Sequence, residues 1–269
     1  MLLNILAMGS HLKEKRTTVD SKDTYYLEGG ESHQQALIFL HGWAIRARTF
    51  KASLSELSNY FHVFAPDLPG LGRTTEFEQS ATYTQYANFC IKFLDSVNVR
   101  QAHLLGHSFG GGVCAATAAL HSERIASLIL LNSAGIPLPP IHTLAVPKII
   151  EVVAQAVRSS FAWPNLFVAK DFLSSWAFRP LSTSQIMLIP ILQDVRPLLP
   201  QIKAPSLIAW GRHDCLIPVE SAEIFNMLIK GSELAVIDDG YHEWSAVQPK
   251  KFVSIVRNFY RRQGFLAAH

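Results

Sequence analysis

The sequence predicts an α/β fold, a doubly wound and mostly parallel sheet with an inserted helical subdomain. Short apolar runs without alternation, such as residues 36–40 and 102–105, are typical of strands buried on both faces of a parallel sheet. These runs alternate with segments of helical periodicity, which implies right-handed crossovers between parallel strands. The composition changes after residue 136, because ten of the 14 prolines lie between Pro137 and Pro205.

Composition limits the protein to a globular class. A chain of 269 residues fits one α/β domain with an insertion, and 49% hydrophobic against 17% charged residues excludes a disordered chain. The net charge of +3 is too small to favour a nucleic-acid partner. Cys90, Cys114 and Cys215 have neither metal nor disulfide spacing, so we expect a reducing, cytoplasmic location.

The apolar runs also bear on membranes and secretion. Residues 1–9 resemble the apolar part of a signal peptide, but the stretch lacks a basic n-region and is short. We therefore expect a terminal leader that frays or packs against the protein. No apolar run approaches the roughly 20 residues that cross a bilayer, so we expect no transmembrane segment.

The first third of the chain is expected to build one half of the sheet. Residues 17–27 alternate polar with β-branched and aromatic residues around Ser21-Lys22-Asp23, which predicts a half-exposed antiparallel hairpin. A buried strand over residues 36–40 then ends in His41-Gly42-Trp43. The next expected elements are a helix over 50–60, a strand over 62–65, a turn-rich loop over 66–72 and a helix over 82–97.

A glycine-flanked serine lies at the centre of the sequence. Residues 102–105 predict a strand, Gly106-His107-Ser108-Phe109-Gly110 a sharp turn, and residues 113–119 a helix. This order is the context that a G-x-S-x-G nucleophile elbow requires. Glycine is required on either side of the serine for a steric reason. So tight a turn has strained backbone angles and leaves no room for neighbouring Cβ atoms.

The second half of the chain contains the insertion. A buried strand over residues 125–132 precedes it, and six aromatic residues give it apolar bulk: Phe161, Trp163, Phe167, Phe172, Trp176 and Phe178. Its helical patches are residues 149–157, 167–178 and 186–192. The sheet pattern returns with a strand over 206–210, a helix over 219–229, a strand over 234–237 and a helix over 249–261. We therefore divide the chain into a core of residues 1–136 and 201–269 and a helical insertion of residues 137–200.

Three polar residues follow predicted strands directly. Ser108, Asp214 and His242 thus come to the carboxyl edge of the sheet, where ligands bind in open α/β folds. A serine hydroxyl is a weak nucleophile, so Ser108 needs a base, and His242 can take its proton and return it to the leaving group. Asp214 can hold the imidazole in the required tautomer. The chain order Ser, Asp, His is the one expected with this elbow in hydrolases.

At this point the sequence resembles the α/β-hydrolase family along nearly its whole length. Five ordered motifs carry the resemblance: Leu40-His41-Gly42-Trp43, Asp67-Leu68-Pro69-Gly70-Leu71-Gly72, Gly106-His107-Ser108-Phe109-Gly110-Gly111, Gly211-Arg212-His213-Asp214-Cys215-Leu216-Ile217-Pro218 and Gly240-Tyr241-His242-Glu243. The resemblance implies an oxyanion hole formed by the backbone N–H groups of Trp43 and Phe109. It further implies that the insertion is a lid over Ser108, that His41 and His107 support loops, and that Asp67 supports the structure of the site.

Several residues near these motifs compete for the catalytic roles. Asp238 and Asp239 follow the strand of His242 itself, whereas the family acid follows a preceding strand, so Asp214 is preferred. The alternative acid position, at the end of the strand before the insertion, carries Asn132, which favours the same choice. The remaining candidates are interpreted as structural: His213 as a solvated loop residue, Cys215 as a packing thiol and Glu243 as a structural or helix-start carboxylate.

The expected reaction is the hydrolysis of a carboxylic ester. Relatives that open epoxides or displace halide carry aspartate at the elbow, so Ser108 favours acyl chemistry. The His41-Gly42-Trp43 start resembles carboxylesterases, and residues 43–46 and His107 depart from the motifs of C–C bond hydrolases. We therefore expect a serine carboxylesterase whose partner is a small-molecule acyl ester.

No cofactor is expected, and no metal, because no histidine and carboxylate spacing matches a metal site. Three alternatives stay open: a ligand receptor or signalling protein of the same fold with slow turnover, an acyltransferase or perhydrolase, and a C–C bond hydrolase.

Overall fold

An eight-stranded sheet forms the centre of the protein, in the order β1-β2-β4-β3-β5-β6-β7-β8. The computed structural model describes residues 12–79, 81–137 and 163–267, without the side chains of residues 163–167. β2 runs antiparallel to both β1 and β4, and all the other neighbours are parallel. The strands are β1 (Lys13–Val19), β2 (Lys22–Gly29), β3 (Ala36–Leu40), β4 (His62–Pro66), β5 (Ala102–His107), β6 (Ile125–Leu131), β7 (Ser206–Gly211) and β8 (Glu233–Ile237).

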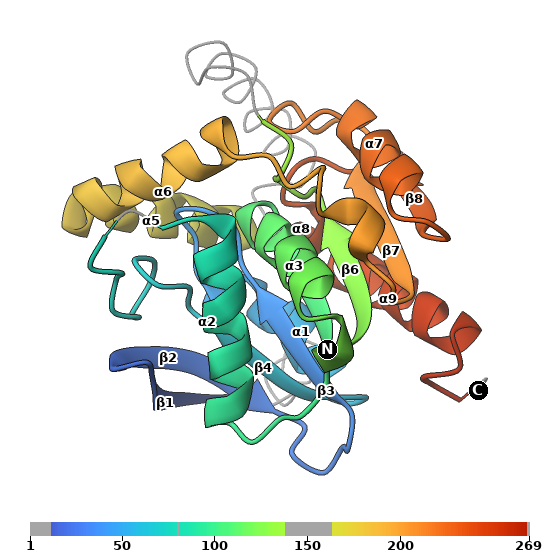
Figure 1. Cartoon of the computed structure of the whole chain (residues 1–269), viewed down its shortest axis with the longest axis horizontal. Helices are drawn as coiled ribbons and strands as arrows, with labels where there is room; N and C mark the ends of the chain where they lie inside the picture. Colours follow the sequence, from blue (N-terminus) through green and yellow to red (C-terminus); the bar gives the residue numbers. More distant parts are fainter. Residues whose placement is uncertain (1–11, 80, 138–162, 268–269) are drawn as a thin grey trace.

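Helices cover both faces of this sheet (Figure 1). On one face, α2 (Tyr83–Ser96), α3 (Phe109–Leu120) and α7 (Glu220–Leu228) share an apolar cluster with the sheet. On the other face, α1 (Lys51–Leu57), α8 (Trp244–Val247) and α9 (Pro249–Arg262) form a second cluster. A sheet covered on both sides explains why its inner strands are continuous apolar runs. The predicted doubly wound, mostly parallel fold is therefore confirmed.

Local sequence signals account for where the elements begin and end. Thr82 starts α2 with a capping box, since its side chain accepts the Gln85 N–H and the Gln85 side chain accepts the Thr82 N–H. The hairpin turns at Asp20 and Ser21, whose φ angles are 51° and 65°, slightly before the predicted centre. Four short elements were not predicted, because three or four residues show no periodicity: η1 (Ala47–Phe50), η2 (Ser122–Arg124), η3 (Leu199–Gln201) and α8.

Two helices of the insertion lie within the described residues. These are α5 (Trp163–Phe178) and α6 (Pro180–Leu192), which match the predicted patches over 167–178 and 186–192. α6 contacts the carboxyl edge of the sheet, because the indole N–H of Trp43, just after β3, donates to the Thr183 carbonyl at 2.8 Å. The predicted patch over 149–157 and the apolar stretch over 1–9 lie outside the described residues. No helix in the described ranges is long and apolar enough to cross a membrane.

Candidate active site

Ser108 lies at the apex of a sharp turn between β5 and α3. Its φ of 54° and ψ of −121° are strained for a residue with a side chain. Close backbone packing holds the turn, because a Cβ on Gly106 would lie 2.5 Å from the Gly110 carbonyl oxygen. A Cβ on Gly110 would lie 2.2 Å from the Leu40 carbonyl oxygen, so only glycine lets α3 approach the strands this closely. The predicted elbow therefore forms, with Ser108 at the N-terminus of α3.

The structure brings Ser108, Asp214 and His242 together at the carboxyl edge of the sheet. His242 Nε2 lies 3.0 Å from Ser108 Oγ, and His242 Nδ1 lies 2.7 Å from Asp214 Oδ2. Because a carboxylate can only accept, Nδ1 carries the imidazole proton and Nε2 is free to accept the hydroxyl proton of Ser108. All three side chains are buried. A hydroxyl, a base and an orienting carboxylate in this arrangement can activate a serine nucleophile.

The Asp214 carboxylate is held by four hydrogen-bond donors. Oδ2 accepts from His242 and, at 2.5 Å, from the side-chain amide of Asn132. Oδ1 accepts from the backbone N–H groups of Leu216 and Ile217 at 2.8 and 2.9 Å. Burial by itself raises the pKa of this carboxyl, but the neighbouring His242 and the hydrogen bonds outweigh it and lower the pKa of Asp214 below its usual value. Asp214 is therefore ionised at neutral pH and fixed in orientation.

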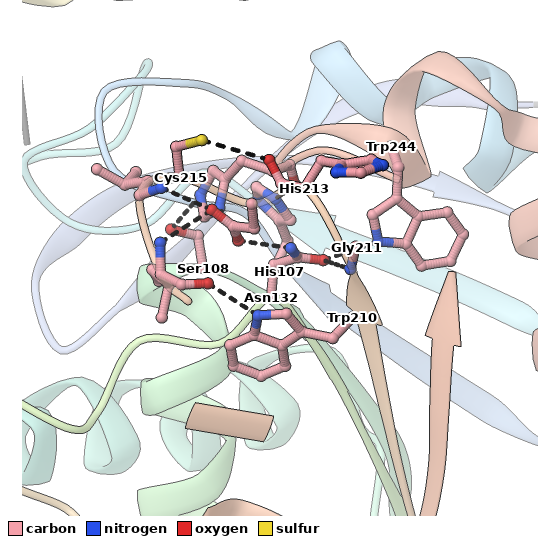
Figure 2. A network of polar contacts seen from close by, with 12 residues as sticks. His107, Ser108, Asn132, Trp210, Gly211, His213, Cys215 and Trp244 are labelled. Carbon is pink, nitrogen blue, oxygen red and sulfur yellow. Dashed lines mark hydrogen bonds and ion pairs between the residues drawn. The ribbon is translucent and has the colours of Figure 1, made fainter. Parts of the chain in front are cut away.

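Asn132 joins this carboxylate to the core, a role that the sequence did not reveal (Figure 2). While its amide nitrogen donates to Asp214, its oxygen accepts from the Trp244 indole N–H at 2.7 Å and from the Gly211 N–H at 3.3 Å. The position of Asn132 at the end of β6 was a signal, since it placed the residue at the same edge as Ser108 and Asp214. For Trp244 no pattern pointed to the contact, because it depends on how α8 packs.

The two predicted oxyanion donors flank Ser108. Phe109 is the first residue of α3, and the first N–H groups of a helix have no acceptor within it. A Cβ on Gly42 would lie 3.1 Å from Ser108 Cβ, so the chain just before Trp43 passes directly beside Ser108. The positive end of the α3 dipole adds to a field that favours negative charge at this point.

The residues predicted to support the site make such contacts. His41 Nδ1 donates to the Gly42 carbonyl, and its Nε2 accepts the Leu68 N–H at 3.0 Å. Asp67 accepts the backbone N–H groups of Ala47 and Arg73 at 3.0 and 2.9 Å. Each side chain thus ties two loops of the site together.

His107 supports the loop that carries His242. Its Nε2 donates to the His242 carbonyl at 2.9 Å, and the two rings lie 4.9 Å apart. Burial, with a smaller effect of the neighbouring His242, lowers the pKa of His107 to about 3. His107 is therefore neutral at physiological pH and adds no charge beside His242.

Three of the competing acids and bases are exposed, and the fourth, Glu243, is buried and directly follows His242 in the chain. Asp238 is exposed and pairs with Arg212 at 2.7 Å, and Asp239 pairs with Lys251 at the surface. His213 is exposed, and Glu243 is the N-cap residue of α8, as the sequence indicated. Within the described part of the chain, no group of three or more His, Cys, Asp or Glu residues is placed to hold a metal ion.

Comparisons with known proteins identify the wider group to which this arrangement belongs. Residues 37–255 match the model described as the alpha/beta hydrolase family. A "Putative non-heme haloperoxidase" of Mycobacterium phage D29 is 26% identical over 239 residues, which cover 82% of this chain and 85% of the relative. The pimeloyl-[acyl-carrier protein] methyl ester esterase of Vibrio cholerae is 27% identical over 231 residues, 77% of this chain and 87% of the esterase.

Among solved structures, a bacterial membrane phospholipase A superposes with a TM-score of 0.80. It is 24% identical in sequence, and the match covers 99% of this chain and 91% of that protein. At this level of identity the likeness bears on the fold alone.

Proposed function

This chain belongs to the alpha/beta hydrolase family, and we propose that it is a serine hydrolase that cleaves a small to medium carboxylic ester through an acyl-enzyme. The observation that carries the proposal is the chain of contacts from Ser108 Oγ through the His242 imidazole to the Asp214 carboxylate, at 3.0 and 2.7 Å. The likeness to a methyl ester esterase over 77% of the chain supports the same reaction class.

The first half of the proposed reaction forms an acyl-enzyme. Ser108 Oγ attacks the ester carbonyl while His242 Nε2 takes the hydroxyl proton, and the Asp214 carboxylate stabilises the imidazolium. The carbonyl oxygen becomes an oxyanion, which accepts hydrogen bonds from the N–H groups of Trp43 and Phe109. Collapse of this intermediate breaks the ester C–O bond, and the alcohol leaves with the proton from His242.

The second half releases the acid. His242 removes a proton from water, the resulting hydroxide attacks the acyl carbon, and the same two N–H groups hold the second oxyanion. Breakage of the acyl–Oγ bond then returns the proton from His242 to Ser108. No cofactor is required in either half of this sequence. The substrate is a small molecule, and the odd number and the spacing of the three cysteines support a cytoplasmic location.

The insertion of residues 137–200 is proposed to be a lid domain that selects the acyl group. The ring of Trp43, beside the proposed oxyanion hole, packs edge-on against Phe172 and Trp176 of α5 with centroid distances of 5.7 and 6.1 Å. Aromatic side chains at this place favour an apolar acyl chain over a charged one.

Burst kinetics with 4-nitrophenyl butyrate test the proposal. We expect a rapid release of one nitrophenol per active site, then steady turnover, and the loss of both phases in Ser108→Ala. Mass spectrometry of the quenched burst should find the butyryl group on Ser108. A ligand receptor of this fold would instead bind the ester with negligible turnover, and that result would end the proposal.

The haloperoxidase relative favours a second acceptor for the same acyl-enzyme. Attack by hydrogen peroxide in place of water would give a peracid, which can oxidise halide. Product analysis with and without peroxide separates the two, since hydrolysis gives only the acid and perhydrolysis gives a peracid that consumes a thioether probe.

A further inference from the structure

The loop that follows β3 is fastened to the insertion by polar contacts. Besides the Trp43 indole bond to the Thr183 carbonyl, the Ser175 hydroxyl donates to the Ala44 carbonyl at 3.0 Å. Arg46 donates to the Ser174 hydroxyl at 2.5 Å. Residues 43–49, which begin with a proposed oxyanion donor, are therefore held by side chains and backbone of α5 and α6 as well as by Asp67 of the core.

Asp171 of α5 is the acidic group in these contacts. It is buried, with an exposed fraction of 2%. Its Oδ2 accepts the Thr49 hydroxyl at 2.8 Å, and its Oδ1 lies 3.5 Å from Nε of Arg46. A buried carboxylate is stable only when such partners compensate for lost hydration, so Asp171 and residues 46–49 must keep this geometry together.

The backbone of the loop needs this support. Ala44, next to Trp43, has a φ of 58°, a left-handed conformation that costs an alanine about 1 kcal/mol or more. From the core side, Asp67 holds the loop through the Ala47 N–H at 3.0 Å. The Thr49 and Arg46 contacts to Asp171 come from α5, so the loop is held by two buried carboxylates that belong to different elements.

We propose that Asp171 is a positioning residue, which acts through Thr49 and Arg46 to keep residues 43–49 in the conformation that presents the Trp43 N–H to the oxyanion. The inference rests on the proposed ester hydrolysis. On this inference α5 helps to set the position of the oxyanion donor and does not only cover the site. A small misplacement of one oxyanion donor lowers kcat without changing ground-state binding.

The test compares Asp171→Leu and Asp171→Asn with a matched control, Asp194→Leu. Asp194 follows α6, and it is exposed and pairs with Arg196 at 2.6 Å, far from residues 43–49 in its contacts. We expect Asp171→Leu to lower kcat about 10- to 100-fold with KM within threefold, and Asp171→Asn, which keeps an acceptor for Thr49, to recover most of it. Asp194→Leu should leave both constants within twofold.

Two further readouts separate positioning from a general loss of structure. Butylboronic acid forms a tetrahedral adduct with a serine nucleophile, so its affinity should fall in Asp171→Leu by the same factor as kcat/KM. Amide hydrogen exchange over residues 43–50 should be faster in Asp171→Leu than in Asp194→Leu. If Asp171→Leu does not fold, Thr49→Val removes the same hydrogen bond from the core side and should change kcat and exchange in the same direction.

An unchanged kcat, a rise in KM alone, or unchanged exchange over residues 43–50 would overturn the inference and leave Asp67 as the support of the loop. Failure of the proposed function is distinguishable from this, because the wild type would then turn over no ester. In that case the exchange experiment, which needs no substrate, still decides whether Asp171 holds the loop.

Discussion

Replacing Asp214 by asparagine should abolish most activity while leaving the fold in place. Each carboxylate oxygen accepts two hydrogen bonds, Oδ1 from the N–H groups of Leu216 and Ile217 and Oδ2 from Asn132 and His242. An asparagine amide can satisfy the two backbone donors with its oxygen, which turns its NH₂ group toward His242. The imidazole then accepts at Nδ1 and carries its proton on Nε2, facing Ser108. In that tautomer it cannot take the hydroxyl proton.

The size of the effect follows from the loss of the base. A wrong tautomer in a serine triad lowers kcat about 10⁴-fold, or roughly 5 kcal/mol of barrier. Steady-state hydrolysis of 4-nitrophenyl butyrate measures kcat, and a urea titration monitors the fold. In this variant the NH₂ group of Asn132 faces the NH₂ group of the new asparagine, so Asn132 loses its hydrogen bond to a charged carboxylate. We therefore expect the free energy of unfolding to fall by about 2 kcal/mol.

A matched control is Asp239→Asn, which removes a carboxylate paired with Lys251 at the surface and should leave kcat unchanged within twofold. Retention of more than a tenth of the wild-type kcat in Asp214→Asn would rule out that Asp214 sets the catalytic tautomer of His242. So would an equal loss in the Asp239 variant.

Three further changes test the packing of the site and of the core. Gly110→Ala places a Cβ 2.2 Å from the Leu40 carbonyl oxygen, so urea denaturation should find the free energy of unfolding lower by about 3 kcal/mol or more, and a loss below 1 kcal/mol would argue against the close packing. Burial lowers the pKa of His103 to about 4, so below about pH 6.5 the unfolded chain binds a proton that the folded chain does not bind until about pH 4. The free energy of unfolding should therefore fall by about 3 kcal/mol as the pH is lowered from about 6.5 to about 4. His103→Phe should remove this part of the pH dependence of stability, and an identical pH dependence in the two proteins would contradict it. Trp244→Phe removes the indole donor to Asn132, so we expect about 1–2 kcal/mol less stability and a few-fold lower kcat, whereas an unaltered kcat would mean that Asn132 holds Asp214 without this contact.

The elbow and the three polar residues could be predicted because the chemistry constrains short segments. Gly106 and Gly110 are required by backbone contacts within the strand, turn and helix that they join, so the pattern is visible locally. Ser108, Asp214 and His242 each follow a strand of a parallel sheet, and the topology alone brings them to one edge.

The contacts that hold these residues depend on packing between distant segments. Thr49 and Asp171 are 122 positions apart, and their hydrogen bond exists only because α5 lies over the loop after β3. The partnership of Asn132 with Trp244 depends in the same way on α8, a helix of four residues that is too short to show a period. Local propensity carries no information about such pairs, so the contacts that support the site could be seen only in the structure.

A panel of 4-nitrophenyl esters of increasing acyl length tests whether Ser108 is the nucleophile of an ester hydrolase. The wild type should turn over the shorter and medium esters in the steady state, with kcat/KM falling as the acyl chain outgrows the site. Ser108→Ala should fall to the background rate with every ester. Turnover that survives in Ser108→Ala, or its absence from the wild type across the whole panel, would contradict the assignment of Ser108 as the nucleophile.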